Sequence, residues 1–330
     1  MTADAANDVG GLVVEQLGVD VVSGGVAVRV VDDVSWVVRA GAAAAIVGES
    51  GAGKSLTARA LVGLLPRAAR AASGRVVVSG SDTDVDVLSL DEPGWRRVRG
   101  ARIGLVMQEP RAAFDPLVRI DEQVGSALRA HRGATRAAAR AAATRALLDV
   151  GLGARHATAW PHELSSGELQ RAALAAALVA DPDVLVADEP TSALDATVAA
   201  QILALLRRER ARRGLALVLV THDLSVAAAH CDEVHVMVAG RIVESGPVAT
   251  VFGAPRHPFA RALLGAAPAR ALPGTPLPTL PPATAPQAWP SGCRFRDRCP
   301  DVAAVCAEEP PWLTLGDRTR VRCARVGVDA

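Results

Sequence analysis

Apolar runs separated by amphipathic stretches dominate the chain. Val26 to Val31 and Val34 to Val38, on either side of Asp32–Asp33, predict a hairpin of two strands. Short apolar runs predict buried strands at 43–47, 103–107, 184–187 and 215–220. Helical patterns cover 55–65, 120–148 with a break at Gly133, the stretch from the loop at 165–167 to Ala180, and 196–213. Buried strands that alternate with helices predict an α/β fold with a parallel sheet covered on both faces.

The pattern changes near residue 250. Before that point, Val234 to Val238 and Arg241 to Glu244 flank Ala239–Gly240 and predict a closing hairpin. Beyond it, 268–290 holds 8 of the 21 prolines, which predicts a stiff extended connector without helix. We therefore expect a main domain over residues 1–250 and a separate small module over 251–330.

Composition and charge narrow the classes of protein. The 330 residues are 50% hydrophobic and 22% charged, as in a globular protein with a real core. A net charge of +1 indicates no nucleic-acid partner, and the arginine-rich stretch 129–145 is interpreted as a solvated helix face. Apolar runs are too short to span a membrane, and the N-terminus, with Asp4 and Asp8, does not resemble a signal peptide. We expect a cytosolic protein whose association with membranes is peripheral.

One glycine-rich stretch lies between a predicted strand and a predicted helix. It fills every fixed position of a phosphate-binding loop and continues into the helix: Gly48, Glu49, Ser50, Gly51, Ala52, Gly53, Lys54, Ser55 and Leu56. Such glycines let backbone N–H groups point at phosphate oxygens at a helix N-terminus. Lys54, the only lysine of the chain, is expected to contact the β- and γ-phosphates, and the Ser55 hydroxyl to bind Mg²⁺.

Two adjacent carboxylates follow the apolar run at 184–187. Asp188 is placed to hold the Mg²⁺ shell and Glu189 to polarise an attacking water. Together with the phosphate loop, the pair predicts nucleotide hydrolysis.

The stretch Leu164-Ser165-Ser166-Gly167-Glu168-Leu-Gln170-Arg171 resembles the signature of the ATP-binding subunits of ABC transporters. Three more stretches are similar to motifs of that family and occur in its order: Gln108 in Met-Gln-Glu-Pro (Q-loop), Ser192-Ala-Leu-Asp195 (D-loop) and Thr221-His222-Asp223 (switch histidine). The resemblance covers residues 12–246. It implies an ABC-type P-loop ATPase with a mostly parallel sheet core, an N-terminal antiparallel β subdomain and a helical insert at about 109–180.

In that family each hydrolysis site is shared between two subunits. The resemblance implies that Ser165, Ser166, Gly167 and Glu168 face the ATP of a partner subunit, at a helix N-terminus that favours anions. It implies that His222 holds the γ-phosphate, that Gln108 senses Mg²⁺ and that Asp195 forms the D-loop.

Two positions depart from the family pattern. Ser166 stands where the family usually has glycine, so its Cβ is expected to crowd the phosphate or to require backbone angles that serine tolerates poorly. The family usually stacks an aromatic residue on the adenine, whereas 12–31 contains none, leaving Val19, Val21 or Val22 as apolar contacts.

The C-terminal part resembles the tail of oligopeptide, dipeptide and nickel importer ATPases, through His257-Pro-Phe-Ala-Arg261, the proline connector and Gly292-Cys293-Arg-Phe-Arg-Asp-Arg-Cys299-Pro300. The resemblance implies the motor of an ABC importer for di- or oligopeptides. It further implies two permease subunits, a second ABC ATPase subunit, an extracytoplasmic solute-binding protein acting indirectly, and a place on the cytoplasmic face of the plasma membrane. The alternatives are an importer of nickel or another small solute and a soluble non-transport ABC ATPase.

Four cysteines lie in this tail, at Cys293, Cys299, Cys306 and Cys323. A disulfide framework is disfavoured in a reducing cytosol, and the spacing lacks the close pairs of most zinc sites. Four thiolates suit an iron–sulfur cluster, and the resemblance to dipeptide importers implies a four-iron four-sulfur cluster. Free thiols and bound zinc remain the alternatives.

Overall fold

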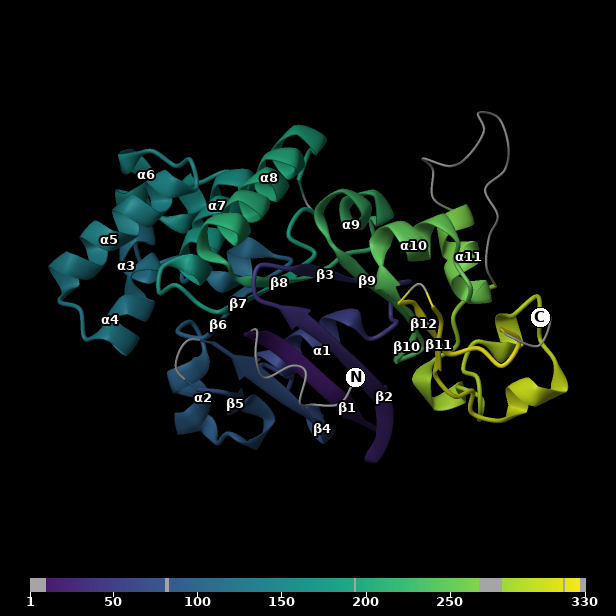
Figure 1. The fold of residues 1–330 in the computed structure, drawn as a ribbon. Coiled ribbons are helices and arrows are strands. Elements are labelled where there is room, and N and C mark those ends of the chain that lie inside the picture. Colours follow the sequence, from purple (N-terminus) through teal and green to yellow (C-terminus); the bar gives the residue numbers. More distant parts are fainter. Residues whose placement is uncertain (1–9, 81–82, 193, 267–280, 317, 327–330) are drawn as a thin grey trace. The chain divides into compact units, whose positions relative to one another are not determined.

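The computed structural model describes residues 10–80, 83–192, 194–266, 281–316 and 318–326 (Figure 1). The chain divides into two compact units, each built from separate stretches of sequence. Unit 1 comprises Met1–Val13, Val37–Ala42 and Val77–Val218, and unit 2 comprises Val14–Trp36, Ala43–Val76 and Leu219–Ala330.

Unit 1 contains a parallel strand pair and a group of helices. Strand β6 (Ile103–Val106) pairs with β7 (Val184–Asp188), as the two apolar runs predict. The helices between them are α3 (Ile120–Val124), α4 (Ser126–Arg132), α5 (Arg136–Asp149), α6 (Ala154–Thr158) and α7 (Ser166–Leu178), which pack together in the teal part of Figure 1. A Cβ at Gly104 would lie 2.6 Å from the Ala177 carbonyl oxygen, so glycine lets α7 approach β6 closely. Unit 1 also holds α2 (Glu92–Val98), β5 (Val85–Asp86) and α8 (Ala196–Arg213).

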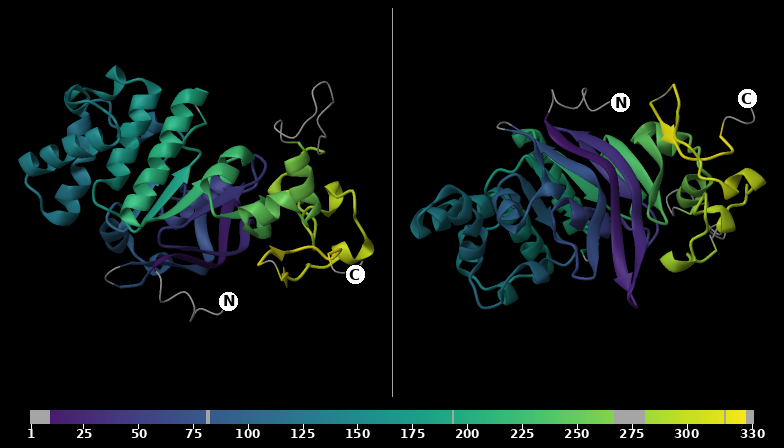
Figure 2. Two further views of the ribbon diagram at one scale, coloured as in Figure 1. Left: turned by 45° about the horizontal axis from the view of Figure 1, so that its top comes forward. Right: turned by 90° about the horizontal axis from the view of Figure 1, so that it is seen from below.

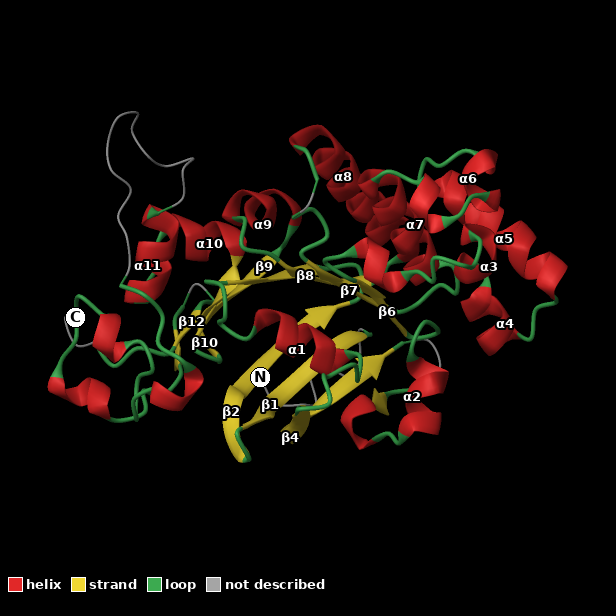
Figure 3. Cartoon of the chain, turned by 180° about the vertical axis from the view of Figure 1, so that it is seen from behind, coloured by secondary structure: helices red, strands yellow, loops and turns green. Residues whose placement is uncertain are grey.

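Unit 2 contains a sheet segment with the strand order β11-β12-β10-β9-β3. Strand β9 (Glu233–Val238) runs parallel to β3 (Ala43–Val47) and antiparallel to β10 (Arg241–Pro247), which confirms the predicted closing hairpin. The short strands β12 (Arg320–Val321) and β11 (Leu313–Thr314) extend this segment. Helices α9 (Leu224–His230), α10 (Val248–Gly253) and α11 (Pro258–Gly265) lie beside these strands (Figure 3), and α1 (Lys54–Leu61) follows β3. Strand β8 (Ala216–Val220) begins in unit 1 and ends in unit 2.

The long antiparallel strands β1 (Gly11–Ser23), β2 (Val26–Arg39) and β4 (Ala69–Ser79) lie side by side in the order β2-β1-β4 (Figure 2). The predicted hairpin within 26–38 is wrong, because β2 is one continuous strand and the turn lies at Gly24–Gly25, where φ is 59° and 82°. Asp33 takes a left-handed φ of 50° within this strand. Both carboxylates are neutralised inside unit 2, Asp32 by Arg241 and Arg294 and Asp33 by Arg322, so the acidic pair needs no solvent-exposed turn.

The connector differs in one detail from the prediction of no helix. Pro286–Ala288 form a short 3₁₀ turn, while 267–280 lie outside the described residues. Within the described part of the chain, no helix combines the length and the apolar character needed to cross a membrane.

Candidate functional site

The phosphate loop in unit 2 has the backbone that its glycines predict. A Cβ at Gly48 would lie 2.1 Å from the Met237 carbonyl oxygen, so the loop passes too close to β9 for any side chain there. Gly51 and Gly53 take φ of 79° and 103°, which disfavour other residues. The buried ammonium of Lys54 lies inside the loop and donates hydrogen bonds to the carbonyl oxygens of Gly48 and Glu49, both at 2.9 Å.

The parallel register of unit 1 brings Gln108 and Glu189 together. Because Val106 pairs with Ala187, the residues that follow the two strands emerge at the same edge of the sheet. There the Gln108 side-chain amide donates to Glu189 Oε2 at 3.2 Å, across 81 positions of sequence. Asp188 ends β7 and is only 6% exposed, and Glu189 takes a left-handed φ of 46°. A non-glycine residue at such a φ is uncommon and is often found at functional sites.

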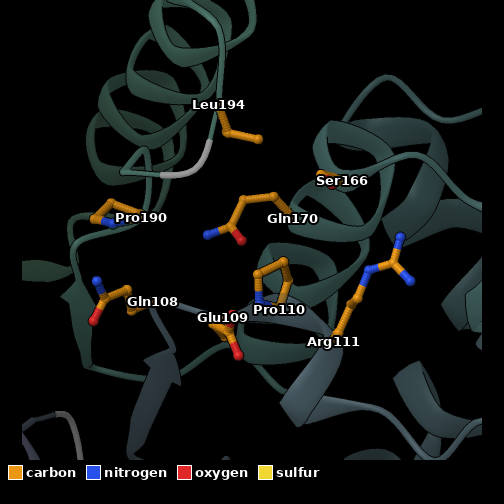
Figure 4. Close-up of a pocket in the computed structure, with 8 residues that line it drawn as sticks. All are labelled: Gln108, Glu109, Pro110, Arg111, Ser166, Gln170, Pro190 and Leu194. Carbon is orange, nitrogen blue, oxygen red and sulfur yellow. The ribbon is translucent and has the colours of Figure 1, made fainter.

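A cavity of about 90 Å³ adjoins this pair within unit 1 (Figure 4). It is lined by Gln108, Glu109, Pro110, Arg111, Ser166, Gln170, Pro190 and Leu194. Figure 4 shows the Gln170 side chain reaching from α7 into the middle of this group. The cavity therefore lies between the segment around Gln108 and the N-terminal end of α7.

The signature residues form the N-terminus of α7. Ser165 caps the helix: its Oγ accepts from the Glu168 N–H at 3.3 Å, and Glu168 Oε2 accepts from the Ser165 N–H at 2.9 Å. The Ser165 N–H and the Ser165 hydroxyl both donate to the Glu168 carboxylate, and together with a hydrogen bond to His156 they hold the pKa of Glu168 below its usual value. The expected need for unusual angles at Ser166 is wrong, because Ser166 is the first residue of a right-handed helix. A Cβ on Gly167 would lie 2.7 Å from Val198 Cγ1, so glycine lets α7 and α8 meet.

The remaining motif residues lie at the starts of helices. Asp195 caps α8 by accepting from the N–H groups of Thr197 and Val198, both at 3.0 Å. His222 is exposed and directly precedes Asp223, which caps α9. Unit 1 thus carries Gln108, the carboxylates, the signature and Asp195, whereas unit 2 carries the phosphate loop and His222.

One expected contact to the adenine is excluded by burial. Val19 is 0% exposed and belongs to the core, whereas Val22 is 47% exposed. Of the valines considered, Val21 and Val22 remain accessible to a base.

The four C-terminal cysteines converge in unit 2. Burial raises the pKa of the Cys293 thiol to about 11, and the nearby sulfurs of Cys306, Cys323 and Cys299 add to the rise. Burial also raises the pKa of Cys299 and of Cys323, each again with a contribution from Cys306. None of the five cysteines, all of which lie in the described part of the chain, forms a disulfide. Across the residues the structure describes, no three His, Cys, Asp or Glu side chains are arranged to hold a single metal ion.

Sequence reasoning missed the contacts that tie the cysteine-bearing tail to the phosphate loop. Arg298 pairs with Glu49, and Arg294 binds the turn behind the loop. A tail of this kind offers no motif that would mark either arginine as a partner of residues so far away in sequence.

Comparisons with known proteins agree with this geometry. The family model of the ABC transporter matches residues 31–192, and that of the oligopeptide/dipeptide transporter C-terminal region matches 243–306. A putative peptide import ATP-binding protein of Brucella abortus is 43% identical over 89% of this chain and 91% of its own. A dipeptide transport ATP-binding protein of Bacillus subtilis is 37% identical, covering 94% and 93%, and an oligopeptide transport ATP-binding protein of Salmonella typhimurium is 39% identical, covering 86% and 84%.

Solved structures extend the likeness to the fold. A dimeric ATP-binding cassette in a post-hydrolysis state with ADP and Pi has a TM-score of 0.64 and 27% identity, covering 72% of this chain and 98% of its own. The cbiO1 subunit of a Clostridium perfringens ABC transporter has a TM-score of 0.62 and 26% identity, covering 75% and 92%. The chain therefore belongs to the ABC transporter family, as an ATPase that carries the oligopeptide/dipeptide transporter C-terminal region.

Proposed function

We propose that this ATPase is the motor subunit of an importer for di- or oligopeptides. The observation that carries the proposal is the match of 243–306 to the oligopeptide/dipeptide transporter C-terminal region. The relatives from three bacteria, named for peptide, dipeptide and oligopeptide transport, support the same solute class.

In the proposed reaction the phosphate loop, from Gly48 to Leu56, binds ATP. Its backbone N–H groups hold the phosphates, Lys54 contacts the β- and γ-phosphates, and Ser55 with Asp188 holds the Mg²⁺ shell. Glu189 polarises the attacking water. The hydrogen bond from the Gln108 amide to the Glu189 carboxylate supports this role, because it orients the base before the water arrives.

Other motif residues are proposed to act between subunits or on the γ-phosphate. The stretch from Ser165 to Glu168, with its helix N-terminus, faces the ATP of a partner, and His222 holds the γ-phosphate. Asp195 belongs to the D-loop between the two sites. A second ABC ATPase subunit therefore completes each site.

The proposed assembly lies on the cytoplasmic face of the plasma membrane. Two permease subunits span the membrane, and an extracytoplasmic solute-binding protein delivers the peptide. We propose that residues 1–250 are the ATPase domain, with the helical insert 109–180 toward the permeases, and that 251–330 are the C-terminal module.

The cysteines are proposed to hold a four-iron four-sulfur cluster. The Cys293 N–H donates to the Cys306 carbonyl oxygen at 3.1 Å, and the sulfurs of Cys306 and Cys323 contribute to the raised pKa of Cys293 and of Cys299, which supports a shared site for the four cysteines. We propose a cluster rather than zinc because four cysteine thiolates are a usual ligand set for iron–sulfur clusters, whereas the spacing lacks the close pairs of most zinc sites. Held by Cys293, Cys299, Cys306 and Cys323, the cluster would tie the ends of the module together.

One purification tests both proposals. The tagged full chain is isolated anaerobically from gently solubilised membranes of its own host, its companions are identified, and iron and sulfide are measured. We expect two permeases, a second ATPase, and four irons per chain that are lost in Cys293→Ser. Recovery with ribosomes or DNA-repair proteins would contradict the import proposal, and a nickel-binding partner in the complex would change the solute. A colourless sample without iron would contradict the cluster.

A further inference from the structure

The C-terminal module reaches the phosphate loop through Arg298. Its guanidinium forms a bidentate ion pair with Glu49, with Nη1–Oε1 and Nη2–Oε2 distances of 2.7 Å, across 249 positions of sequence. The side chains of Arg298 and Glu49 are 9% and 21% exposed. A fork of this geometry, shielded from water, is stronger than the usual surface ion pair.

Glu49 contacts both Arg298 and the lysine of the loop, Lys54. Its carbonyl oxygen accepts from the Lys54 ammonium at 2.9 Å, while its carboxylate is held by Arg298. One residue therefore lies between the module and the cation that the proposed function places on the phosphates. A change at Arg298 alters both the position and the charge balance of this end of the loop.

Arg298 is itself fixed by the module. Its Nε donates to the Pro281 carbonyl oxygen at 2.8 Å, and its guanidinium lies 5.6 Å from the centre of the Phe295 ring. Phe295 is 1% exposed and packs edge-on against Phe259 of α11, at 5.3 Å between ring centres. Arg298 is therefore anchored in a packed part of the C-terminal module.

A second contact supports the other end of the loop. Arg294 donates to the Ala239 carbonyl oxygen at 2.8 Å, and the next residue, Gly240, donates its N–H to the Ala52 carbonyl oxygen at 2.9 Å. Arg294 also pairs with Asp32 at 2.7 Å. The module thus supports the loop directly at Glu49 and, through the β9–β10 turn, at Ala52.

We propose that the C-terminal module is a structural part of the nucleotide site, with Arg298 as a positioning residue for the phosphate loop. Arg298 keeps the Glu49 carboxylate away from the phosphates and neutralises its charge, which would otherwise repel ATP. The inference rests on the proposed ATP binding and adds that the affinity for ATP depends on residues beyond 290.

The test is a double-mutant cycle on the full chain, with the dissociation constant of ATP–Mg²⁺ measured by calorimetry. Arg298→Ala is expected to weaken binding about tenfold, because it leaves one uncompensated negative charge beside the phosphates. Adding Glu49→Gln to Arg298→Ala removes that charge, so the double variant is expected to recover most of the affinity for ATP–Mg²⁺. Arg296→Ala, in the same 3₁₀ turn, is the matched control and is expected to bind like the wild type.

Two results would overturn the inference: equal affinity in Arg298→Ala and Arg296→Ala, or a loss in Arg298→Ala that Glu49→Gln does not relieve. Amide hydrogen exchange of residues 48–54 without nucleotide provides a second measurement. Faster exchange in Arg298→Ala than in Arg296→Ala supports the contact, and equal exchange contradicts it. Failure of the wild type to bind ATP would instead overturn the proposed function, while the exchange experiment would still decide whether Arg298 holds the loop.

Discussion

His257 shows how one buried side chain couples the C-terminal region to pH. It is 1% exposed, and its Nδ1 accepts the Phe259 N–H at 3.0 Å, which caps α11. Burial lowers the pKa of His257 to about 3, so the ring is neutral in the folded chain. The backbone N–H of His257 donates to the buried carboxylate of Glu244, whose pKa is raised by burial.

Because of His257, the free energy of unfolding is expected to decrease as the pH decreases. Unfolding releases a side chain that takes up a proton below pH 6.5, so the free energy of unfolding falls as the pH falls from 6.5 toward about 3. His257→Asn keeps an acceptor for the Phe259 N–H but does not titrate. Between pH 7 and pH 5 we expect the free energy of unfolding of His257→Asn to fall by about 2 kcal/mol less than that of the wild type.

Thermal unfolding at the two pH values measures this difference. The control is His162→Asn at an exposed position, which is expected to retain the wild-type dependence. His235, whose pKa burial also lowers to about 3, keeps part of the acid sensitivity in both variants. An unchanged pH dependence in His257→Asn would contradict the assignment.

At the scale of elements, the signature is also a helix start. The serine and glutamate of Ser165-Ser-Gly-Glu168 bond reciprocally, so the residues proposed to face a partner's ATP also satisfy free N–H groups of α7. Gly167 meets the first turn of α8 at Val198. The same backbone segment therefore begins α7 and forms the proposed phosphate-binding site.

Removing the cap should loosen this turn. Ser165→Ala is expected to destabilise the start of α7 by about 1 kcal/mol, and amide hydrogen exchange at 166–169 should accelerate accordingly. Ser166→Ala is the control, because it keeps the Ser165 cap. Equal exchange in the two variants would show that the cap does not hold the helix.

Across the whole chain, the residues proposed to act in hydrolysis come from stretches far apart in sequence. Gln108 and Glu189 meet only because β6 and β7 pair in parallel. With one set of motifs per chain, the proposed function requires two chains, and ATP favours the closed pair by binding it more tightly than the open one.

Glu189→Gln should trap that closed pair. Without its carboxylate the water is not polarised, so bound ATP persists, and size-exclusion chromatography with ATP–Mg²⁺ should show a dimer or a pair with the second subunit. Turnover should fall at least about 100-fold, in line with the loss of a general base. Adding Lys54→Ala should abolish the dimer. Undiminished turnover in Glu189→Gln would contradict the role of the base.

The sequence predictions are accurate where an element depends on residues close together in sequence, and they fail where it depends on distant residues. Helix α8 has the predicted bounds, and the β9–β10 hairpin forms as expected, because periodicity and turn residues act locally. The hairpin expected within 26–38 does not form, since ion pairs with distant arginines neutralise Asp32 and Asp33 inside a continuous strand. Local polarity alone could not reveal those partners.

The phosphate loop, the carboxylate pair and the signature can each be recognised in the sequence alone, because each is a short contiguous stretch whose proposed chemistry depends on neighbouring residues. Which distant groups meet is known only from the folded chain: Gln108 with Glu189, Cys293 with Cys306, and Arg298 with Glu49. Such contacts depend on strand register and on packing of the whole core, which no local pattern encodes.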